Sequence, residues 1–267
     1  MRNFYFEKDI EFIRTTYPIC GAEYCAKHLN RTKCAIKTKA HLLGIVLNKN
    51  VNAEQFLNIK TEEVAYILGL LWADGNVSFA NNKAKTPIIK HNSKPFDNII
   101  FLEILNKTGK WNTFTSKNIG TFSKNINDIC TNWISSRKIG EYLIENDYRN
   151  KKKSPNKIIS KIPDSLKHLW FRGFFDGDGS VTIKPKGHHS IAFTGDKNQD
   201  WSFIVNLFKF LEIINFKIRV QSNTFGSWSH LRITNKCDLL KLEKYLYSDF
   251  DEHNLGLLRK RIQFKQL

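Results

Sequence analysis

Two nine-residue stretches of the chain share one pattern, "ILGLLWADG" at residues 67–75 and "FRGFFDGDG" at residues 171–179. Each stretch is largely apolar, carries a glycine at its third position and ends on an aspartate followed by a glycine. A glycine inside a helix costs on the order of 1 kcal/mol relative to alanine. Gly69 and Gly173 are each followed four positions later by another small residue, so the small residues share one helix face. This spacing predicts that the two helices pack against each other with their backbones in close approach.

Such packing would bring the final acids of the two stretches, Asp74 and Asp178, side by side. Each acid would lie at a helix C-terminus, where the macrodipole disfavours negative charge, and two adjacent carboxylates repel each other. The arrangement is unfavourable unless a cation lies between them. Magnesium binds in proteins through one or two carboxylates together with waters and substrate phosphates. The pattern therefore predicts a magnesium site between two parts of the chain.

The segments that follow the two stretches also match in kind. Asp74 and Asp178 are 104 positions apart, and after each acid we expect two strands, a helix, two strands and a helix. The order α-β-β-α-β-β-α would then occur twice. We therefore predict an α+β protein with two pseudo-symmetric halves, residues 62–160 and 161–267.

Two strands of the second half alternate clearly between apolar and polar residues. In residues 216–223 and 228–234 the apolar positions, which include Phe216, Ile218 and Val220, predict one face packed on a core and one face in water. The polar face is cationic and rich in amide and hydroxyl groups, which favours a nucleic-acid platform over an ordinary solvated surface. The residues nominated to contact DNA bases or phosphates are Lys184, Lys186, Arg219, Gln221, His230 and Arg232.

Residues 1–48 differ from both halves and are expected to form three short helices. Thr32 is a predicted N-cap, and Gly44 is a predicted stop. The spacing of apolar residues around the turn is typical of a helix-turn-helix, which would point Lys33 and Lys37 into a DNA major groove. A small helical cap without DNA contact is the alternative. Residues 49–61 are expected to be a linker.

The charge of the chain favours a polyanionic partner. The formal net charge is +17, which attracts nucleic acid, and no long basic amphipathic helix indicates a membrane partner. The five cysteines form no CxxC pair, and the first twelve residues lack an apolar run, so we expect no signal peptide and an intracellular, reducing compartment such as the cytoplasm or an organelle matrix. A zinc site at Cys20, Cys25, His28 and Cys34 is an alternative that fits no common ligand spacing.

The two nine-residue stretches resemble the motif of the LAGLIDADG homing endonucleases and align with it without gaps. The resemblance spans about residues 61–267, in the form with two motifs on one chain. It implies a saddle of strands over the DNA major groove and Mg²⁺-dependent cleavage of both strands. It also implies that Asp74 and Asp178 bind metal and are catalytic, with assistance from the carbonyl groups of Ala73 and Gly177.

The sequence departs from this family pattern at two positions, Trp72 and Arg172. Trp72 and Asp176 occupy the sixth position of the motif, which is usually acidic but is not the metal ligand. Arg172 replaces a small residue and is expected to crowd the interface between the motif helices.

A lysine near the end of each half would stabilise the charge that develops on the attacked phosphate, as in related enzymes. Lys153 and Lys260 fit this role because they follow their aspartates by 79 and 82 positions. Lys151, Lys152 and Arg259 are close rivals, and phosphate contact alone is the alternative for each of them.

The expected function is therefore site-specific, Mg²⁺-dependent cleavage of double-stranded DNA by a monomer, as for an enzyme of intron homing. Two alternatives stay open. The first is a DNA-binding regulator that does not cut, a class in which the motif acids are lost. The second is a maturase that binds its own intron RNA, since the same basic saddle suits RNA.

Overall fold

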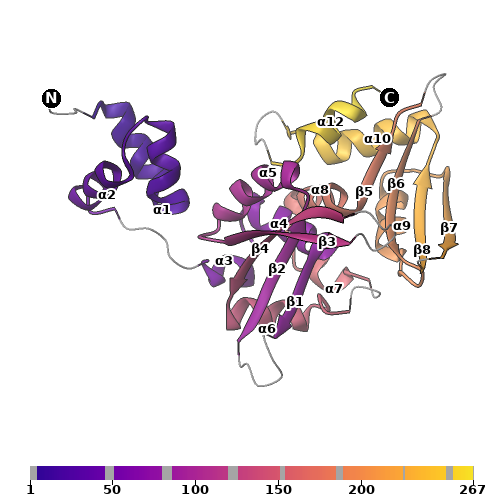
Figure 1. Ribbon diagram of the computed structural model, residues 1–267. Helices are drawn as coiled ribbons and strands as arrows, with labels where there is room; N and C mark the ends of the chain where they lie inside the picture. The colour runs from indigo at the N-terminus through magenta and orange to yellow at the C-terminus, as the bar shows by residue number, and fades with distance from the viewer. Residues whose placement is uncertain are drawn as a thin grey trace.

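The computed structural model describes residues 5–45, 51–79, 86–119, 126–150, 154–184, 189–224, 226–250 and 255–266. Figure 1 shows the two N-terminal helices standing apart from a larger body, in which two sheets flank a central pair of helices. Among the described residues no helix is both long enough and apolar enough to cross a membrane.

The first half is a four-stranded antiparallel sheet with helices on one face. The strand order is β1-β2-β4-β3, and each neighbouring pair is antiparallel. The hydroxyl of Thr61 caps α4 by accepting a hydrogen bond from the amide of Val64. The elements are α4 (Glu62–Asp74), β1 (Gly75–Phe79), β2 (Pro87–Ser93), α5 (Pro95–Asn106), β3 (Asn112–Ile119), β4 (Ile126–Ser135), α6 (Arg137–Glu145) and α7 (Asn156–Ile159).

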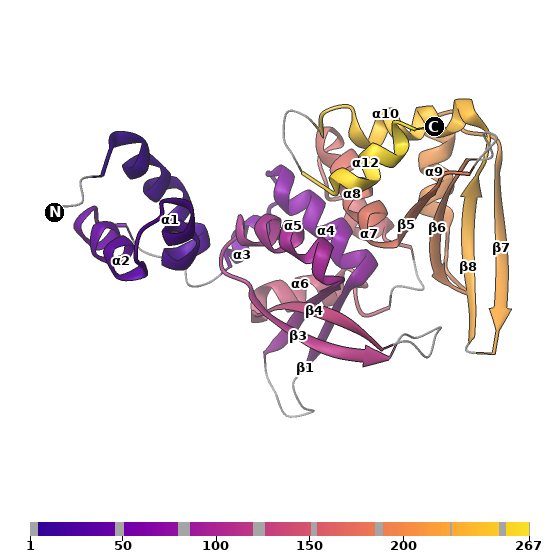
Figure 2. The same cartoon turned by 45° about the horizontal axis from the view of Figure 1, so that its top comes forward.

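The second half repeats this plan with strand order β5-β6-β8-β7. A short 3₁₀ turn, Asp164–Leu166, precedes its first helix. The elements are α8 (Lys167–Asp178), β5 (Gly179–Thr182), β6 (Ser190–Asp196), α9 (Ser202–Phe210), β7 (Phe216–Asn223), β8 (Gly226–Ile233), α10 (Lys236–Tyr247) and α12 (Leu258–Phe264). The predicted fold, an α+β protein with the order α-β-β-α-β-β-α occurring twice, is confirmed. Figure 2 shows the two sheets diverging from the central helices.

The two motif helices, α4 and α8, cross at their glycines. A Cβ atom built on Gly69 would lie 1.9 Å from the carbonyl oxygen of Trp170, and one on Gly173 would lie 2.1 Å from that of Tyr66. Both distances are far below any van der Waals contact, so only glycine permits this approach. The helices are buried almost throughout, and one continuous core extends from them into both halves. The predicted close packing of the motif helices is therefore present.

Strand β7 departs from the predicted one-sided burial. Phe216 at its start packs on Phe208 of α9, with the ring centroids 5.2 Å apart. Farther along, the side chains of Ile218 and Val220 are 47% and 60% exposed. β7 is the edge strand of its sheet, and the strand continues beyond the part that packs on the core. The expectation of a buried face is thus wrong for the second part of β7, whereas the equivalent residues of β8 are buried.

The N-terminal helices have a core of their own. Helix α1 (Glu7–His28) breaks at Gly21, where φ is 76°, so that with α2 (Lys33–Leu42) three helical segments result, as expected. Thr32 caps α2 as predicted, and Gly44 follows its end with φ of 67°. The buried residues of this unit are Ile13, Ala22, Cys25, Ala26, Ile36 and Ala40.

Part of the expected linker is ordered and belongs to the first half. Helix α3 (Ala53–Leu57) lies within residues 49–61, and Phe56 is fully buried in the main core. Ile59 is buried in the same core, so the two apolar side chains tie this segment down.

Arg172 does not crowd the helix interface, contrary to expectation. Its side chain is fully buried, and the guanidinium donates hydrogen bonds to the carbonyls of Leu246 and Leu255 and to the carboxylate of Asp249. These partners lie in and beyond α10, away from α4. His168 of α8 also contacts Asp249, with Nε2 2.8 Å from Oδ2. The arginine therefore anchors α8 to the C-terminal part of the chain.

The Gly69→Ala variant tests the helix crossing. Alanine in a helix normally stabilises by about 1 kcal/mol relative to glycine, but here its methyl group would meet the Trp170 carbonyl. We expect the free energy of unfolding, measured by chemical denaturation, to fall by about 1–3 kcal/mol. Gly195→Ala is the control because a Cβ there meets the flexible side chain of Gln199 at 3.0 Å. A gain in stability for Gly69→Ala would contradict the crossing.

The Asp249→Asn variant tests the buried ion pair. Burial raises the pKa of Asp249, but His168 and Arg172 outweigh it, so the pKa lies below its usual value in the folded state. The pair therefore stabilises the fold above about pH 4 and ceases to do so as pH falls through the folded pKa. We expect the variant to be less stable at pH 7 by about 3 kcal/mol, because a buried arginine loses its partner. The difference should narrow below about pH 4.

The control for this measurement is Asp164→Asn, whose carboxylate pairs with Lys167 but is 93% exposed. An exposed pair contributes less than about 1 kcal/mol, so this variant should show little change at any pH. A constant gap between wild type and Asp249→Asn from pH 7 to pH 3 would show that Asp249 does not act through its charge.

Candidate active site

The two motif aspartates are the last residues of their helices and meet where α4 and α8 end side by side. A Cβ on Gly177 would lie 2.3 Å from the Cβ of Ala73 and 2.9 Å from Oδ2 of Asp74. Asp178 directly follows Gly177, so the second carboxyl group is attached next to the first. Both side chains are half-buried. The structure thus brings together Asp74, Asp178, Ala73 and Gly177, the four residues predicted to bind metal.

Each aspartate lines its own hollow between the two halves. The Asp74 hollow has a volume of about 470 Å³, and the Asp178 hollow has a volume of about 450 Å³. Lys94 and Arg259 line the first hollow, and Arg149 and Gln199 line the second. Both hollows draw residues from both halves, as expected for two equivalent sites related by the pseudo-twofold arrangement. Two strands of a duplex could each present one phosphate to such a pair.

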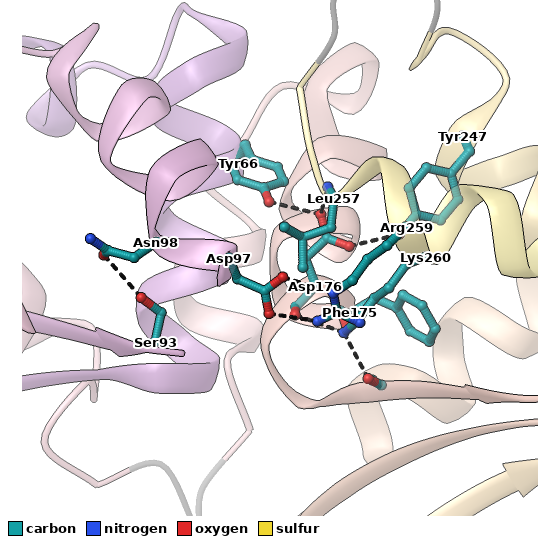
Figure 3. Close-up of polar contacts among 11 residues, drawn as sticks. Tyr66, Ser93, Asp97, Asn98, Phe175, Asp176, Tyr247, Leu257, Arg259 and Lys260 are labelled. Atoms are coloured by element: carbon teal, nitrogen blue, oxygen red, sulfur yellow. Dashed lines mark hydrogen bonds and ion pairs between the residues drawn. The ribbon is translucent and has the colours of Figure 1, made fainter. Parts of the chain in front are cut away.

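The Asp74 hollow is bordered by ion pairs that cross between the halves (Figure 3). Arg259 of α12 donates two hydrogen bonds of 2.7 Å to the carboxylate of Asp97 on α5. The side chain of Asp97 is only 10% exposed, whereas that of Arg259 is 41% exposed, so the carboxylate is shielded from water and the guanidinium is partly open to it. The geometry of the pair is bidentate, which is the strong form of an arginine–carboxylate contact. The pair links α12 of the second half to α5 of the first half at the edge of the hollow.

Lys260, predicted to be catalytic, is buried below the same hollow. Its ammonium donates to the carbonyl oxygens of Phe175, Asp176 and Gly179 at 2.6, 2.7 and 2.7 Å. These carbonyls belong to the last turn of α8 and the first residue of β5. Burial lowers the pKa of Lys260 to about 8, although the Asp176 carboxylate opposes this shift. All three protons are engaged, so contact with a phosphate would require one of these bonds to break.

The Asp178 hollow offers a different set of polar groups. Arg149 lies over the ring of Phe79, with its guanidinium carbon 5.6 Å from the centroid, and Asn150 and Asp196 line the wall. Lys153, the second predicted catalytic lysine, lies outside the described residues.

The sixth position of the motif differs between the halves. Asp176 is buried, and its carboxylate accepts hydrogen bonds from the hydroxyls of Tyr66 and Tyr247 at 2.7 Å and from the amide of Leu257 at 2.9 Å (Figure 3). Burial, followed by the Asp176 charge, raises the pKa of both tyrosines well above the usual value, which keeps them neutral donors. Asp176 therefore holds the helix pair and the C-terminal part of the chain together.

Trp72 occupies the sixth position of the motif in the first half and supports its helix by apolar packing. Its ring packs edge-on against Tyr148, with the centroids 5.0 Å apart, and the hydroxyl of Tyr148 donates to the carbonyl of Leu68 at 2.9 Å. The sixth position is thus structural in both halves, by hydrogen bonds in one and by ring packing in the other.

The oxygen atoms at the helix ends fit a hard divalent cation. Two carboxylates and two main-chain carbonyls are the donor type that magnesium and calcium prefer. Among the described residues no group of three or more His, Cys, Asp or Glu side chains could hold a metal, which includes the cysteines near the N-terminus. Waters and substrate phosphates would complete the coordination of a cation at this site.

Four of the residues nominated for DNA contact lie together on the second sheet. Arg219, Gln221, His230 and Arg232 line one hollow of about 600 Å³. Arg219 is opposite His230 in the strand pairing. Burial lowers the pKa of His230, and the charges of Arg232 and Arg219 lower it further, so the imidazole is neutral at pH 7. This surface can therefore both donate to base acceptors and neutralise phosphates.

The remaining nominated residues lie elsewhere. Lys184 is exposed just beyond β5, whereas Lys186 is outside the described residues. Lys33 and Lys37 are on α2 of the N-terminal unit, where Lys33 pairs with Glu23 at 3.0 Å and Lys37 is exposed.

Several site residues were missed by sequence reasoning. Lys217 lines the same hollow as Arg219 and could have been found, since the two are two positions apart on one strand. Lys94, Arg149 and Gln199 line the aspartate hollows only because distant segments fold together, and no local pattern marks them.

Comparisons with known proteins agree with this architecture. Residues 165–247 match the model of the LAGLIDADG-like domain family, and no curated protein matches the chain significantly by sequence. Among solved structures, mesophilic variants of the homing endonuclease I-DmoI match with a TM-score of 0.52 and 15% identity, over 77% of this chain and 98% of that chain.

Two further solved structures are similar at a lower level. The homing endonuclease I-WcaI bound to its DNA recognition sequence matches with a TM-score of 0.49 and 14% identity, over 84% of this chain and 96% of that chain. I-DmoI in complex with DNA and Ca matches with a TM-score of 0.45 and 13% identity, over 74% and 93% of the two chains. The match of residues 165–247 to the LAGLIDADG-like domain model confirms the resemblance to the LAGLIDADG family that the two motifs predicted.

Proposed function

We propose that the protein is a site-specific endonuclease that cuts both strands of a DNA duplex. The observation that carries this proposal is the meeting of Asp74 and Asp178 at the ends of two crossing helices. Each acid lines its own hollow, and the two hollows are similar in size. Two equivalent sites on one chain suit the two strands of one duplex, so we propose that the protein acts as a monomer.

The proposed cofactor is a divalent cation, and Mg²⁺ is the one we favour because its usual ligands are carboxylates, waters and phosphates. Asp74 and Asp178 would hold it, assisted by the carbonyls of Ala73 and Gly177. A bound cation would activate a water for attack and stabilise the leaving oxygen.

The proposed substrate is duplex DNA held against the two sheets. The hollow that contains Arg219 and Arg232 provides cations for phosphates and donors for base edges. Lys184 lies exposed just beyond β5 of the same sheet, and Lys37 of the N-terminal unit would add a more distant contact. An RNA partner is the competing proposal that the experiment below distinguishes.

Lys260 contributes to this function by holding the end of α8. Its three hydrogen bonds fix the carbonyls that flank Asp178, and so fix where that carboxylate points. We propose that Lys260 is a positioning residue. A catalytic role was predicted from its distance along the chain from Asp178, but positioning alone accounts for its buried location.

The first test replaces the two aspartates. We expect Asp74→Asn and Asp178→Asn, singly and together, to lower cleavage of a selected duplex at least about a hundredfold in the presence of Mg²⁺, because each loses a charged ligand. Binding of the duplex should remain. Asp164→Asn is the matched control, since this exposed carboxylate is remote from the site.

Two measurements, one on the double variant and one on wild type, separate the competing functions. Cleavage that persists in it with Mg²⁺ present would refute the active-site assignment. A filter-binding comparison of duplex DNA with host intron RNA, made on wild type, would favour a maturase if only the RNA were retained.

The second test is Lys260→Met, which keeps the length of the side chain and removes the charge. We expect the free energy of unfolding to fall by about 2–3 kcal/mol, because three buried carbonyls lose a charged donor. Lys265→Met is the control, at an exposed position just after the C-terminal end of the same helix. Unchanged stability together with lost cleavage would assign Lys260 to catalysis and not to positioning.

A further inference from the structure

The two sheets present very different side chains on the faces that point away from the core. On each sheet the core-facing residues, such as Ile89 and Phe193, are fully buried, so their neighbours along the strand point outward. We call these outward faces the first and second reading faces. The strand pairing arranges their residues in rows that cross each sheet, and the rows of one sheet can be compared with those of the other.

The row that begins at the first outward residue of β1 or β5 differs between the two sheets. In the first half it consists of Asn76, Lys90, Trp133 and Asn112, one residue from each strand. In the second half the equivalent row consists of Ser180, Ala192, Arg232 and Lys217. Strands β4 and β3 thus carry an indole and an amide in the first half, where β8 and β7 carry a guanidinium and an ammonium in the second.

The next row shows the same contrast. Phe114 and Thr131 face each other in the first half, where His230 and Arg219 face each other in the second. The ring of Phe114 is 48% exposed and so is accessible to a partner. Arg219 is also exposed.

These side chains recognise different bases. Arginine donates two hydrogen bonds to O6 and N7 of guanine, whereas an aromatic ring contacts the methyl group of thymine and asparagine pairs with adenine. On the four strands of the first half, within the part of the chain that the structure describes, Lys90 is the one charged side chain in these two rows. In these two rows of described residues the first reading face therefore offers one lysine and no arginine, against two arginines and one lysine on the second, so it has fewer groups that select guanine.

We infer that the two halves of the target site differ in composition, with a guanine-containing half-site on the second reading face and an A·T-rich half-site on the first. This inference rests on the proposed function and specifies its substrate. Arg219 and Arg232 are the residues that would select guanine, and Phe114 is the residue that would contact thymine.

The experiment uses the full chain with Asp74→Asn and Asp178→Asn, so that bound DNA stays uncut. A duplex library randomised on both sides of a fixed centre is selected for binding at about 150 mM salt, near physiological ionic strength, and the bound fraction is sequenced. We expect guanine to be enriched on one side and A·T pairs on the other. Equal composition on both sides of the selected sites would overturn the inference and leave the proposed function intact, whereas a protein that enriches no duplex would contradict the proposed function itself.

Matched variants assign each side to a reading face. Arg219→Lys and Arg232→Lys keep the charge but lose the two-pronged geometry, so each should lower the guanine preference about tenfold, on the guanine-containing side alone. The salt dependence of binding should stay unchanged. Phe114→Ala should relax selection only on the A·T-rich side. If the lysine variants keep the guanine preference, the two arginines contact phosphates alone and the inference is wrong.

Discussion

The contact between the backbones of α4 and α8 is the constraint on which the rest of the structure depends. At Gly69 and Gly173 the helices approach so closely that neither position can hold a Cβ atom. The same crossing sets the distance between the two helix ends, and therefore the distance between Asp74 and Asp178. A looser interface would separate the acids, and each would then lie alone at an unfavourable helix C-terminus. The crossing of the two helices thus determines both the packing of the core and the geometry of the site.

The two halves support this shared interface by different means. The second half uses buried polar contacts, in which Asp176 accepts hydrogen bonds from two tyrosines and Arg172 binds Asp249. The first half uses ring packing between Trp72 and Tyr148. Buried polar groups are costly unless every partner is present, and they specify one arrangement when it is. The second helix is therefore held in position more specifically than the first, which explains why an arginine is tolerated inside its motif.

The sequence alone predicted the repeat, the start of α2 at Thr32 and the meeting of the motif helices. These features depend on local patterns, such as the small residue that follows four positions after each of Gly69 and Gly173. It did not predict the exposure of Ile218, which depends on how far β7 extends past the core, or the burial of Lys260. Contacts such as that of Lys260 with the end of α8 join segments about eighty residues apart, and no local pattern in the chain encodes them. The role of Asp176 was missed for the same reason.

The site and the reading faces are connected without an intervening loop. Strand β1 begins at Gly75 and strand β5 at Gly179, each immediately after a motif aspartate. The first outward residues, Asn76 and Ser180, are therefore held at a fixed separation from the acids by continuous backbone. In a duplex bound to both sheets, the phosphates beside the acids would then lie at a set number of base pairs from the bases that are read. Flexible connections at these two points would allow the position of the cut to vary. Because each strand follows its helix directly, a duplex bound in one register would be cut at one position.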